Sequence, residues 1–248
     1  MSSTQNIYDN EEFFDGYHRL RENKQSANEV MEKPALRSLY PDLTGTAVLD
    51  LGCGYGENCA EFLTKGAARV VGVDISERML AVAEAEHGGE GIEFIRGDMS
   101  DLSFLTGSFD VVFSSLAVHY VKDFARLARE VAGLLSPGGC FIFSQEHPMT
   151  TAPKAGASWT RGDGGDVLHY NLADYGRGGV RHVRWIVDGV IKYHRTFSDI
   201  INALTDAGLR VDRMVEPTPT PELILTDKRW EKVYHKPDFL LIRASKER

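Results

Sequence analysis

Short apolar runs alternate with segments of helical spacing along the first part of the chain. Apolar runs that predict buried strands cover 47–51, 69–74, 92–96, 110–114 and 140–144. Between them, apolar residues recur at intervals of three and four, which predicts helices over 57–65, 77–87 and 123–135. Parallel strands need a connection that crosses one face of the sheet, so this alternation predicts an α/β fold with a parallel sheet.

The chain before the first strand carries a different pattern. Its aromatic and apolar positions between 11 and 22 fall roughly on one side of a predicted helix. A second short helix is predicted over 29–39, with Pro34 near its beginning or at a break. No linker is long enough to demand two domains, so we expect a single domain over 1–248, with 1–40 as an N-terminal helical cap segment.

The stretch after the fifth strand is dense in glycine and polar residues, with scattered tryptophan and tyrosine. This composition predicts an irregular insert at 149–195 that acts as a lid over the active face, because loops of such length are usually functional or mobile. Regular periodicity returns with a helix predicted over 196–207 and strands over 209–215 and 239–243. No convincing crossover helix separates the last two strands, so we expect an antiparallel hairpin at the end of the sheet.

A glycine-rich turn follows the first predicted strand. The sequence reads D-L-G-C-G-Y-G from Asp50 to Gly56, and a helical pattern begins at Glu57. A strand that turns through glycine into a helix N-terminus presents a ligand at the carboxyl end of the strand. The dinucleotide fingerprint is G-x-G-x-x-G, whereas this turn reads G-x-G-x-G after a carboxylate. Asp50 would repel a pyrophosphate and suits a cationic ligand, which disfavours an NAD-dependent oxidoreductase.

Side chains suited to a nucleoside recur at the ends of the next strands. Asp74 ends the second strand, 22 residues after the first glycine of the turn, and a carboxylate there can accept both hydroxyls of a ribose. Asp98 follows the third strand and can accept the exocyclic amine of an adenine, with Ile75 and Met99 against the ring faces. Ser115 follows the fourth strand. Because the carboxyl ends of parallel strands share one edge of a sheet, we expect these residues to form one site.

Composition restricts the class of partner. With 28 Lys and Arg against 36 Asp and Glu, the formal net charge is −8, which argues against a broad nucleic-acid or anionic-membrane surface. No apolar run approaches a membrane span and the polar start has no signal-peptide core, so a cytoplasmic protein is expected. Cys53, Cys59 and Cys140 indicate reduced thiols rather than a disulfide framework or a zinc site.

Five short sequence motifs contain or follow these strand ends: D-L-G-C-G-Y-G, G-V-D-I-S, G-D-M, F-D-V-V-F-S-S-L-A-V-H-Y and L-L-S-P-G-G. In order and spacing they resemble the five successive motifs of class I S-adenosylmethionine (SAM)-dependent methyltransferases. Within that superfamily the chain is most similar to the ubiquinone/menaquinone-biosynthesis type (UbiE-like, methyltransferase type 11) and its small-molecule relatives. The resemblance implies a Rossmann-like, seven-stranded, mostly parallel sheet of order 3-2-1-4-5-7-6, with strand 7 antiparallel and helices on both faces.

The resemblance also implies SAM as the cofactor and S-adenosylhomocysteine (SAH) as the product. In such enzymes an acidic and aromatic N-terminal segment commonly covers the cofactor cleft, which makes Tyr17 and Arg19 candidates for the methionine carboxylate. The alternative is that both residues only pack on the sheet edge. The predicted cofactor-binding residues are Asp50, Gly52, Gly54, Asp74, Ile75, Met79, Asp98, Met99, Ser115, Tyr17 and Arg19.

Two histidines stand at the ligand-facing end of the predicted sheet. His119 follows strand four and His147 follows strand five, and either imidazole can accept a proton near neutral pH. We expect His119 or His147 to line the acceptor pocket as the catalytic candidates; the alternative is that each is hydrogen-bonded into the loop scaffold. Tyr120 and 193–195 are second-line candidates. Asp123 alone after strand four is most simply a helix N-cap, so no metal is expected.

The sequence therefore predicts an enzyme that transfers a methyl group from SAM to a small-molecule acceptor by in-line displacement and releases SAH. A base is needed only if the acceptor is a hydroxyl or a carbon acid. A tRNA or rRNA methyltransferase remains open, as does a SAM-binding regulatory protein without catalysis. We expect no extended nucleic-acid surface, no membrane association, and a monomer or homodimer.

Overall fold

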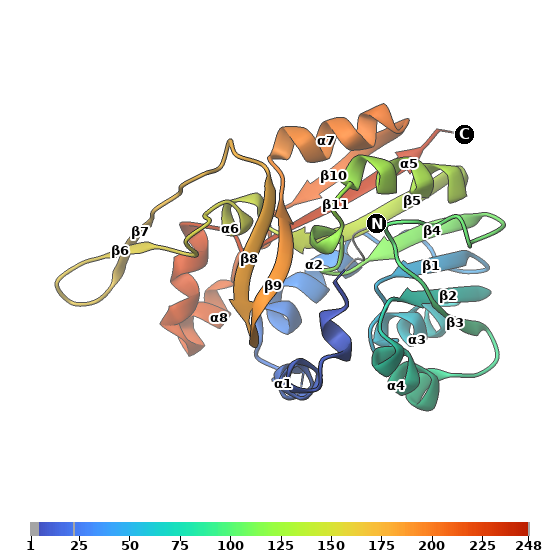
Figure 1. Cartoon of the computed structure of the whole chain (residues 1–248), viewed down its shortest axis with the longest axis horizontal. Helices are drawn as coiled ribbons and strands as arrows, with labels where there is room; N and C mark the ends of the chain where they lie inside the picture. The colour runs from blue at the N-terminus through green and yellow to red at the C-terminus, as the bar shows by residue number, and fades with distance from the viewer. Residues whose placement is uncertain (1–4, 22, 248) are drawn as a thin grey trace.

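A seven-stranded sheet forms the centre of the protein (Figure 1), in a computed structural model that describes residues 5–21 and 23–247. The strand order is β10-β11-β5-β4-β1-β2-β3, and β11 runs antiparallel to both of its neighbours. Because β10 and β11 are the sixth and seventh strands of this sheet, the predicted order 3-2-1-4-5-7-6 is confirmed. The strands are β1 (Ala47–Leu51), β2 (Arg69–Asp74), β3 (Ile92–Arg96), β4 (Phe109–Ser114), β5 (Leu135–Glu146), β10 (Leu209–Val215) and β11 (Phe239–Lys246).

The central strands are apolar on both faces. In register, Val48 of β1 lies between Val70 of β2 and Val111 of β4, and all three side chains are buried. A parallel sheet covered by helices on both sides excludes water from each face, which favours continuous runs of valine, isoleucine and leucine. The apolar runs seen in the sequence therefore mark the strands that lie in the middle of the sheet.

Helices cover both faces of the sheet (Figure 1). One face carries α5 (Phe124–Leu134) and α7 (Phe197–Asp206), which pack against each other. The other face carries α2 (Lys33–Arg37), α3 (Glu57–Thr64) and α4 (Glu77–His87). Among the described residues, no helix is long and apolar enough to cross a membrane.

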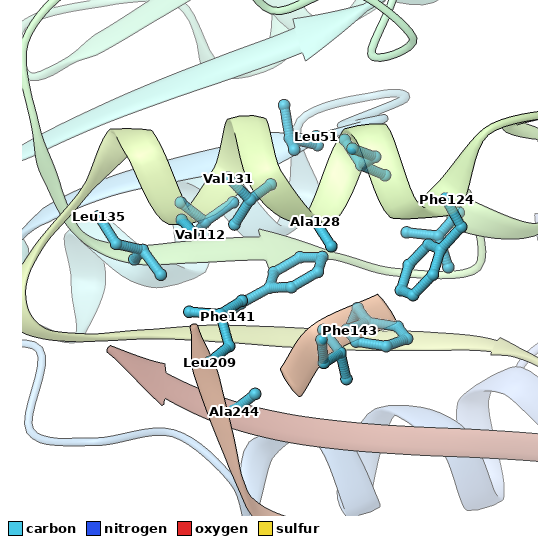
Figure 2. Packing of buried hydrophobic residues seen from close by; sticks show 14 of the residues in the cluster. Leu51, Val112, Phe124, Ala128, Val131, Leu135, Phe141, Phe143, Leu209 and Ala244 are labelled. Atoms are coloured by element: carbon cyan, nitrogen blue, oxygen red, sulfur yellow. The ribbon is translucent and has the colours of Figure 1, made fainter. Parts of the chain in front are cut away.

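The larger hydrophobic core lies between the sheet and the helices α5 and α7. Figure 2 shows Ala128 and Val131 of α5 beside Phe141 and Phe143 of β5, whose rings stack with centroids 4.7 Å apart. On the opposite face, the ring of Phe62 in α3 lies edge-on to Phe113 of β4 at 5.0 Å. Truncating a buried phenylalanine to alanine typically costs about 3–5 kcal/mol, so these rings dominate the stability of the sheet that positions the site.

The N-terminal segment contains η1 (Ile7–Asp9), α1 (Glu11–Arg21) and the π-helical turn η2 (Asn28–Glu32), which continues into α2. The predicted helix over 11–22 is confirmed to Arg21, and Glu22 lies outside the described residues. The predicted helix over 29–39 begins as the π-helical turn and ends at Arg37.

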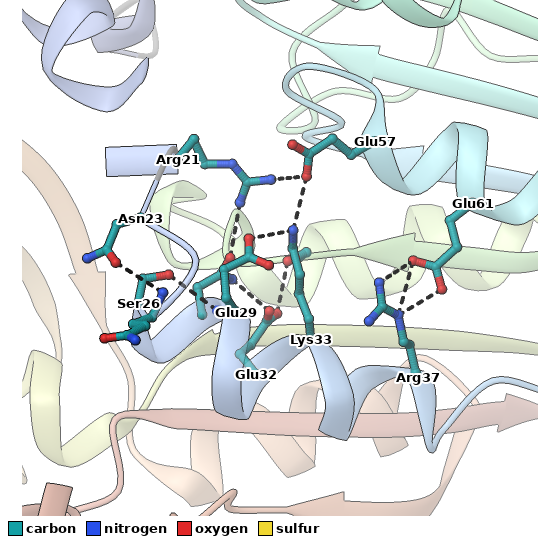
Figure 3. A network of polar contacts seen from close by, with 12 residues as sticks. Arg21, Asn23, Ser26, Glu29, Glu32, Lys33, Arg37, Glu57 and Glu61 are labelled. Atoms are coloured by element: carbon teal, nitrogen blue, oxygen red, sulfur yellow. Dashed lines mark hydrogen bonds and ion pairs between the residues drawn. The ribbon is translucent and has the colours of Figure 1, made fainter. Parts of the chain in front are cut away.

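A network of ion pairs fastens this N-terminal segment to α3 (Figure 3). Glu57, the first residue of α3, pairs with Arg21 of α1 and with Lys33 of α2, whose Nζ lies 3.0 Å from Glu57 Oε2. Further along, Arg37 donates three hydrogen bonds to Glu61, including one of 2.8 Å from Nη2 to Oε2. Because α3 starts at the glycine-rich turn, the network fixes α1 and α2 next to that turn.

The expectation of an irregular insert is wrong, because two hairpins form there. They consist of β6 (Trp159–Arg161) with β7 (Val167–Tyr170), and β8 (Gly179–Trp185) with β9 (Val187–His194), after the short helix α6 (Pro148–Thr151). The turn between β8 and β9 is made by Ile186 at a φ of 63°, a conformation that a β-branched residue rarely adopts. The Asp-Gly pair at 188–189 falls inside β9 rather than at the turn, so the usual hairpin signal does not mark the position of this turn.

Two further differences concern turn-like segments. The strand predicted over 140–144 is longer, since β5 begins at Leu135 and includes the Ser-Pro-Gly-Gly run at 136–139. The segment after the proline-rich stretch forms α8 (Pro221–Thr226) and the 3-10 helix η4 (Lys228–Tyr234), neither of which was predicted. Pro221 stands in the first turn of α8, where a missing N–H costs nothing.

Candidate active site

A cavity of about 390 Å³ opens at the carboxyl ends of β1, β2, β4 and β5. Its wall runs from the glycine-rich turn and the ends of β2 and β3 to an aromatic and charged region beyond β4 and β5. The N-terminal segment and the β8–β9 hairpin supply the remaining wall. Open α/β sheets bind their ligands at this edge, so the cavity is the candidate active site.

The glycines of the turn have separate reasons to lack a side chain. Gly52 has a φ of 77°, and a Cβ there would lie 2.5 Å from the Cβ of Ala117. Gly54 also has a positive φ, of 55°, but a Cβ there would meet nothing within 4 Å, and the residue lines the cavity. Gly56 approaches the ring of Phe94, where a Cβ would come within 2.6 Å. The first and third glycines therefore permit close packing, and the second leaves backbone open to a ligand.

Asp50 is a fully buried carboxyl at the end of β1. Its Oδ2 accepts a hydrogen bond from the thiol of Cys59 at 3.6 Å, while Oδ1 has no partner among the described residues. Burial raises the pKa of Asp50 to about 7. Asp50 lies behind the turn and is not part of the cavity wall. A buried carboxylate oxygen without a donor is costly, and a cationic group bound at the turn would relieve that cost.

Asp74 lines the cavity at the end of β2 and is held by backbone amides. Its Oδ2 accepts from the N–H of Gly54 and its Oδ1 from the N–H of Ser76, each at 2.9 Å. Burial raises the pKa of this carboxyl, while those two N–H donors lower it. Each carboxylate oxygen has a second lone pair, so both remain able to accept a hydroxyl of a bound ligand.

The end of β3 supplies the next part of the wall. Asp98 is fixed by the N–H of Ser100, which donates to Oδ1 at 2.8 Å. Met99, Ile75 and Met79 line the same part of the cavity and give it an apolar surface. A flat heterocycle with an exocyclic amine fits such a wall, because Oδ2 of Asp98 keeps its acceptor capacity.

Most of the predicted cofactor-binding residues come together in this cavity. Those on its wall are Gly52, Gly54, Asp74, Ile75, Met79, Asp98, Met99, Ser115 and Tyr17. Arg19 is exposed on α1 and does not line the cavity, whereas Arg21 does. Residues four apart share a helix face, so Arg21 lies on the face of Tyr17 and Arg19 points elsewhere. Helical periodicity was the signal that identifies Arg21.

Glu32 is a buried carboxyl that the sequence did not single out. It lies in η2 and accepts hydrogen bonds from Ser115 at 2.9 Å, from Ser144 and from Asn28 at 2.7 Å. Burial raises the pKa of Glu32 to about 7, against the lowering effect of the two serine hydroxyls. The carboxyl ties the N-terminal segment to the ends of β4 and β5, directly behind the cavity wall at Ser115.

His119 lines the cavity in the short 3-10 helix η3 (Val118–Tyr120). Burial lowers the pKa of its imidazole to about 3, so the ring is neutral at physiological pH. The N–H of Glu146 points at Nδ1 from 3.5 Å, which favours the tautomer with the proton on Nε2. In that state Nε2 donates a hydrogen bond, so the ring is a poor base.

His147 does not line the cavity. Its Nδ1 accepts from the N–H of Met149 at 3.1 Å and so caps α6, and its Nε2 lies 2.8 Å from Oε1 of Glu216. Both ring nitrogens are thus occupied by the scaffold, and burial lowers the pKa of the ring. The expectation that His147 lines the acceptor pocket is therefore replaced by the alternative, a histidine hydrogen-bonded into the loop structure. Tyr120 lines the cavity and 193–195 do not.

A buried ion pair stands at the far end of the cavity, opposite the glycine turn. Lys192 of β9 lies with its Nζ 2.6 Å from Oε1 of Glu146, the last residue of β5. The ammonium also lies over the ring of Trp185, 4.8 Å from its centroid. All three residues line the cavity. The sequence did not identify Lys192, because its position depends on where the β8–β9 hairpin docks.

The beginning of the chain closes over the cavity. Gln5 exchanges hydrogen bonds with β9, donating to the carbonyl of Gly189 at 3.0 Å and accepting from the N–H of Ile191 at 2.8 Å. Asp9 accepts from the hydroxyl of Ser76 at 2.6 Å, at the N-terminus of α4. Residues 5–9 and the segment 179–194, which contains the β8–β9 hairpin, thus form the roof of the cavity.

Comparison with known proteins places this geometry in a family. Residues 49–143 match the family model described as a methyltransferase domain. An S-adenosylmethionine-dependent methyltransferase from Mesorhizobium loti is 38% identical in sequence and superposes with a TM-score of 0.82, over 90% of this chain and 99% of that one. A putative S-adenosylmethionine-dependent methyltransferase from Listeria monocytogenes is 34% identical with a TM-score of 0.80, over 88% and 97% of the two chains.

A further similarity covers less than half of the chain. The demethylmenaquinone methyltransferase of Lactococcus lactis subsp. lactis (strain IL1403) is 35% identical over 113 residues, which is 43% of this chain and 45% of that protein. The match is confined to less than half of either chain. The similarity to the Mesorhizobium and Listeria structures spans nearly the whole fold, so this chain belongs to the SAM-dependent methyltransferases, and it is an enzyme that uses SAM as its cofactor.

Proposed function

We propose that the protein transfers the methyl group of SAM to a small-molecule acceptor that binds in the same cavity, and releases SAH. The observation that carries this proposal is the continuity of the cavity. One space joins the strand ends at Asp74 and Asp98 to the aromatic and charged region at Glu146 and Lys192. A donor and an acceptor bound at its two ends would therefore lie side by side without intervening protein.

The donor end suits SAM in charge and shape. A cation bound at the glycine turn would stabilise buried Asp50, whose Oδ1 has no hydrogen-bond partner among the described residues. The methionine part of SAM carries such a cation, an ammonium beside its sulfonium. Asp74 would accept hydrogen bonds from the ribose hydroxyls and Asp98 one from the adenine amine, while Arg21 would donate to the methionine carboxylate. When bound, SAM supplies an electrophilic methyl group on a positively charged sulfur.

The chain's own contribution is alignment and exclusion of water. The N-terminal cap segment 1–40 and the insert 149–195 together act as a lid, because their roof contacts enclose the cavity. Holding two reactants near the attack geometry is worth up to roughly 7–11 kcal/mol of the barrier. A neutral His119 that donates from Nε2 orients the acceptor, and a proton released by a hydroxyl acceptor would pass to a carboxylate at the far end.

A small acceptor accounts for the size and charge of the site. A cavity of about 390 Å³ lies within the range for small-molecule sites and is too enclosed for a folded RNA. The net charge of −8 offers little to a polyanion. The similarity to a demethylmenaquinone methyltransferase supports the same class of acceptor.

Calorimetric titration with SAH, followed by product profiling, tests the proposal. The wild-type protein should bind SAH, and Asp74→Asn should weaken binding by roughly 10- to 100-fold through lost charge-assisted hydrogen bonds. Asp110→Asn is the matched control, since Asp110 accepts from Ala47 at the opposite end of the sheet. No SAH affinity in the wild type, or equal loss in both variants, would refute the donor site.

Incubation of a cell extract that contains both metabolites and RNA with SAM carrying an isotopically labelled methyl group then reports the acceptor. Label in a small molecule supports the proposal. Label recovered only in RNA identifies a nucleic-acid methyltransferase instead. SAH binding without any labelled product identifies a regulatory protein.

A further inference from the structure

The far end of the cavity is built around a pair of opposite charges that leave specific polar atoms unused. Lys192 and Glu146 have side chains that are 6% and 25% exposed, and their closest atoms are 2.6 Å apart. The ammonium of Lys192 is further enclosed by the rings of Trp185 and Tyr120, at 4.8 and 5.9 Å. An ammonium held between a carboxylate and two aromatic faces is satisfied without a ligand.

Two polar atoms of this region remain able to bind a ligand. Oε1 of Glu146 is taken by Lys192, but no described side chain or amide donates to Oε2. The Nδ1 of His119 faces a backbone N–H, so its Nε2 carries the proton and lacks an acceptor among the described residues. Both residues are on the cavity wall. The region therefore offers one hydrogen-bond acceptor and one donor.

The charges of this region decide which molecules can enter it. The ammonium and the carboxylate cancel, so the region is neutral before a ligand arrives. A cationic ligand that reaches Oε2 of Glu146 would also approach Lys192, and an anionic ligand that reaches Lys192 would approach Glu146. Inside a cavity of low dielectric such like-charge contacts and the loss of hydration are costly. A group without charge avoids both costs.

The walls beside the pair are aromatic. Tyr8 lies edge-on to Tyr120 with ring centroids 6.1 Å apart, and Trp185 faces the cavity from the β8–β9 hairpin. Such walls favour a flat apolar body over a long polar chain. We infer that Glu146, Lys192 and His119 form an acceptor subsite that selects an uncharged molecule with a flat apolar body and a hydroxyl, which donates to Glu146 Oε2 and accepts from His119 Nε2.

This inference rests on the proposed function, because it assigns the acceptor end of the same cavity. The simpler possibility is that the Lys192–Glu146 ion pair only attaches β9 to the end of β5 and selects no ligand. The chain contains a second ion pair of the same length that can serve as a control. Lys236 and Asp238 also lie 2.6 Å apart, with side chains 6% and 28% exposed, but neither lines the cavity.

Fragment binding to the SAH-loaded protein tests the subsite without requiring turnover. The probes are benzyl alcohol, benzylamine and benzoate, which share a ring and differ in charge at neutral pH, and ligand-observed NMR gives their affinities. The wild type should bind the alcohol at least about tenfold more tightly than either charged probe. Glu146→Gln leaves Lys192 uncompensated and should shift preference towards benzoate by about tenfold.

Lys192→Met leaves the carboxylate uncompensated and should shift preference towards benzylamine, while Lys236→Met should leave the wild-type order unchanged. Equal affinity of the wild type for all three probes would overturn the inference, as would variants at Glu146 and Lys192 that keep the wild-type order. SAH affinity is measured first on every sample and reports folding of the cavity. If the wild type does not bind SAH, both the proposed function and this inference are refuted. If the wild type binds SAH but binds the fragments without selectivity, only this inference is refuted.

Discussion

Glu32 predicts a measurable pH dependence of stability. Its carboxyl is fully buried between Ser115, Ser144 and Asn28, and burial raises its pKa from 4.5 to about 7. Between these two values the folded protein keeps a proton that the unfolded chain has lost. The stability linked to this group is therefore complete below pH 4.5 and is lost as the pH rises through about 7.

The magnitude follows from the same two pKa values. One pKa unit corresponds to about 1.4 kcal/mol, so the difference between the unfolded and folded pKa of Glu32 is worth about 3 kcal/mol of unfolding free energy. Between pH 5 and pH 8 the wild type should lose about 2.5 kcal/mol relative to a variant that cannot ionise at this position. Glu32→Gln is that variant. Its amide oxygen can still accept from Ser115 and Ser144, while its amide nitrogen faces the donor of Asn28, which adds a cost that does not depend on pH.

The assay is urea unfolding followed by tryptophan fluorescence at both pH values, with linear extrapolation to water. The quantity of interest is the wild-type free energy of unfolding minus that of Glu32→Gln, because other titrating groups cancel in the difference. Glu231→Gln, at an exposed position in η4, controls for the loss of a carboxyl. A difference that changes by less than about 0.5 kcal/mol from pH 5 to pH 8 would refute the reasoning.

Three further predictions concern the turn, its buried carboxyl and a helix cap. Gly52→Ala should lower SAH affinity at least about tenfold and lower the melting temperature. The reason is that the new Cβ would lie 2.5 Å from the Cβ of Ala117, at a backbone φ of 77° that alanine rarely adopts. Unchanged affinity and melting temperature would contradict this contact. SAH affinity of the wild type should rise as the pH passes through about 7, where Asp50 ionises beside Cys59, and Asp50→Asn should bind weakly without that rise. Thr196→Ala removes the capping box of α7 and should cost about 1 kcal/mol of unfolding free energy in urea, with SAH affinity unaltered.

The sheet and its helices could be predicted because their signals are local. The run 47–51 and the glycines after it encode strand, turn and helix start within a few residues, and β1 and α3 begin at the predicted positions. Ser76 stands directly before the apolar helix pattern, where N-cap residues occur, and its hydroxyl accepts from the N–H of Met79. Periodicity and caps act over one turn, so a single sequence displays them.

The far end of the cavity could not be predicted because it joins distant segments. Lys192 reaches Glu146 across 46 positions, and only the docking of the β8–β9 hairpin brings them together. Glu32 meets Ser144 across 112 positions for the same reason. His147 has the sequence features of a site histidine, yet the loop that follows β5 turns it towards Glu216. The roles of the cofactor-binding residues stay predictions that the titrations above address.

The roof has a consequence for the order in which the protein folds. Gln5 bonds to Ile191, 186 positions away, and closing so long a loop in an unfolded chain costs about 5 kcal/mol of entropy. The hydrogen bonds that Gln5 makes return only about 1 kcal/mol each, so the roof cannot nucleate folding. It forms after the sheet has brought its two ends together, and on a ribosome only once β9 has emerged. Once the sheet has formed it holds the two segments close together, so the bonds between Gln5 and β9 no longer oppose that entropy and instead stabilise the closed cavity.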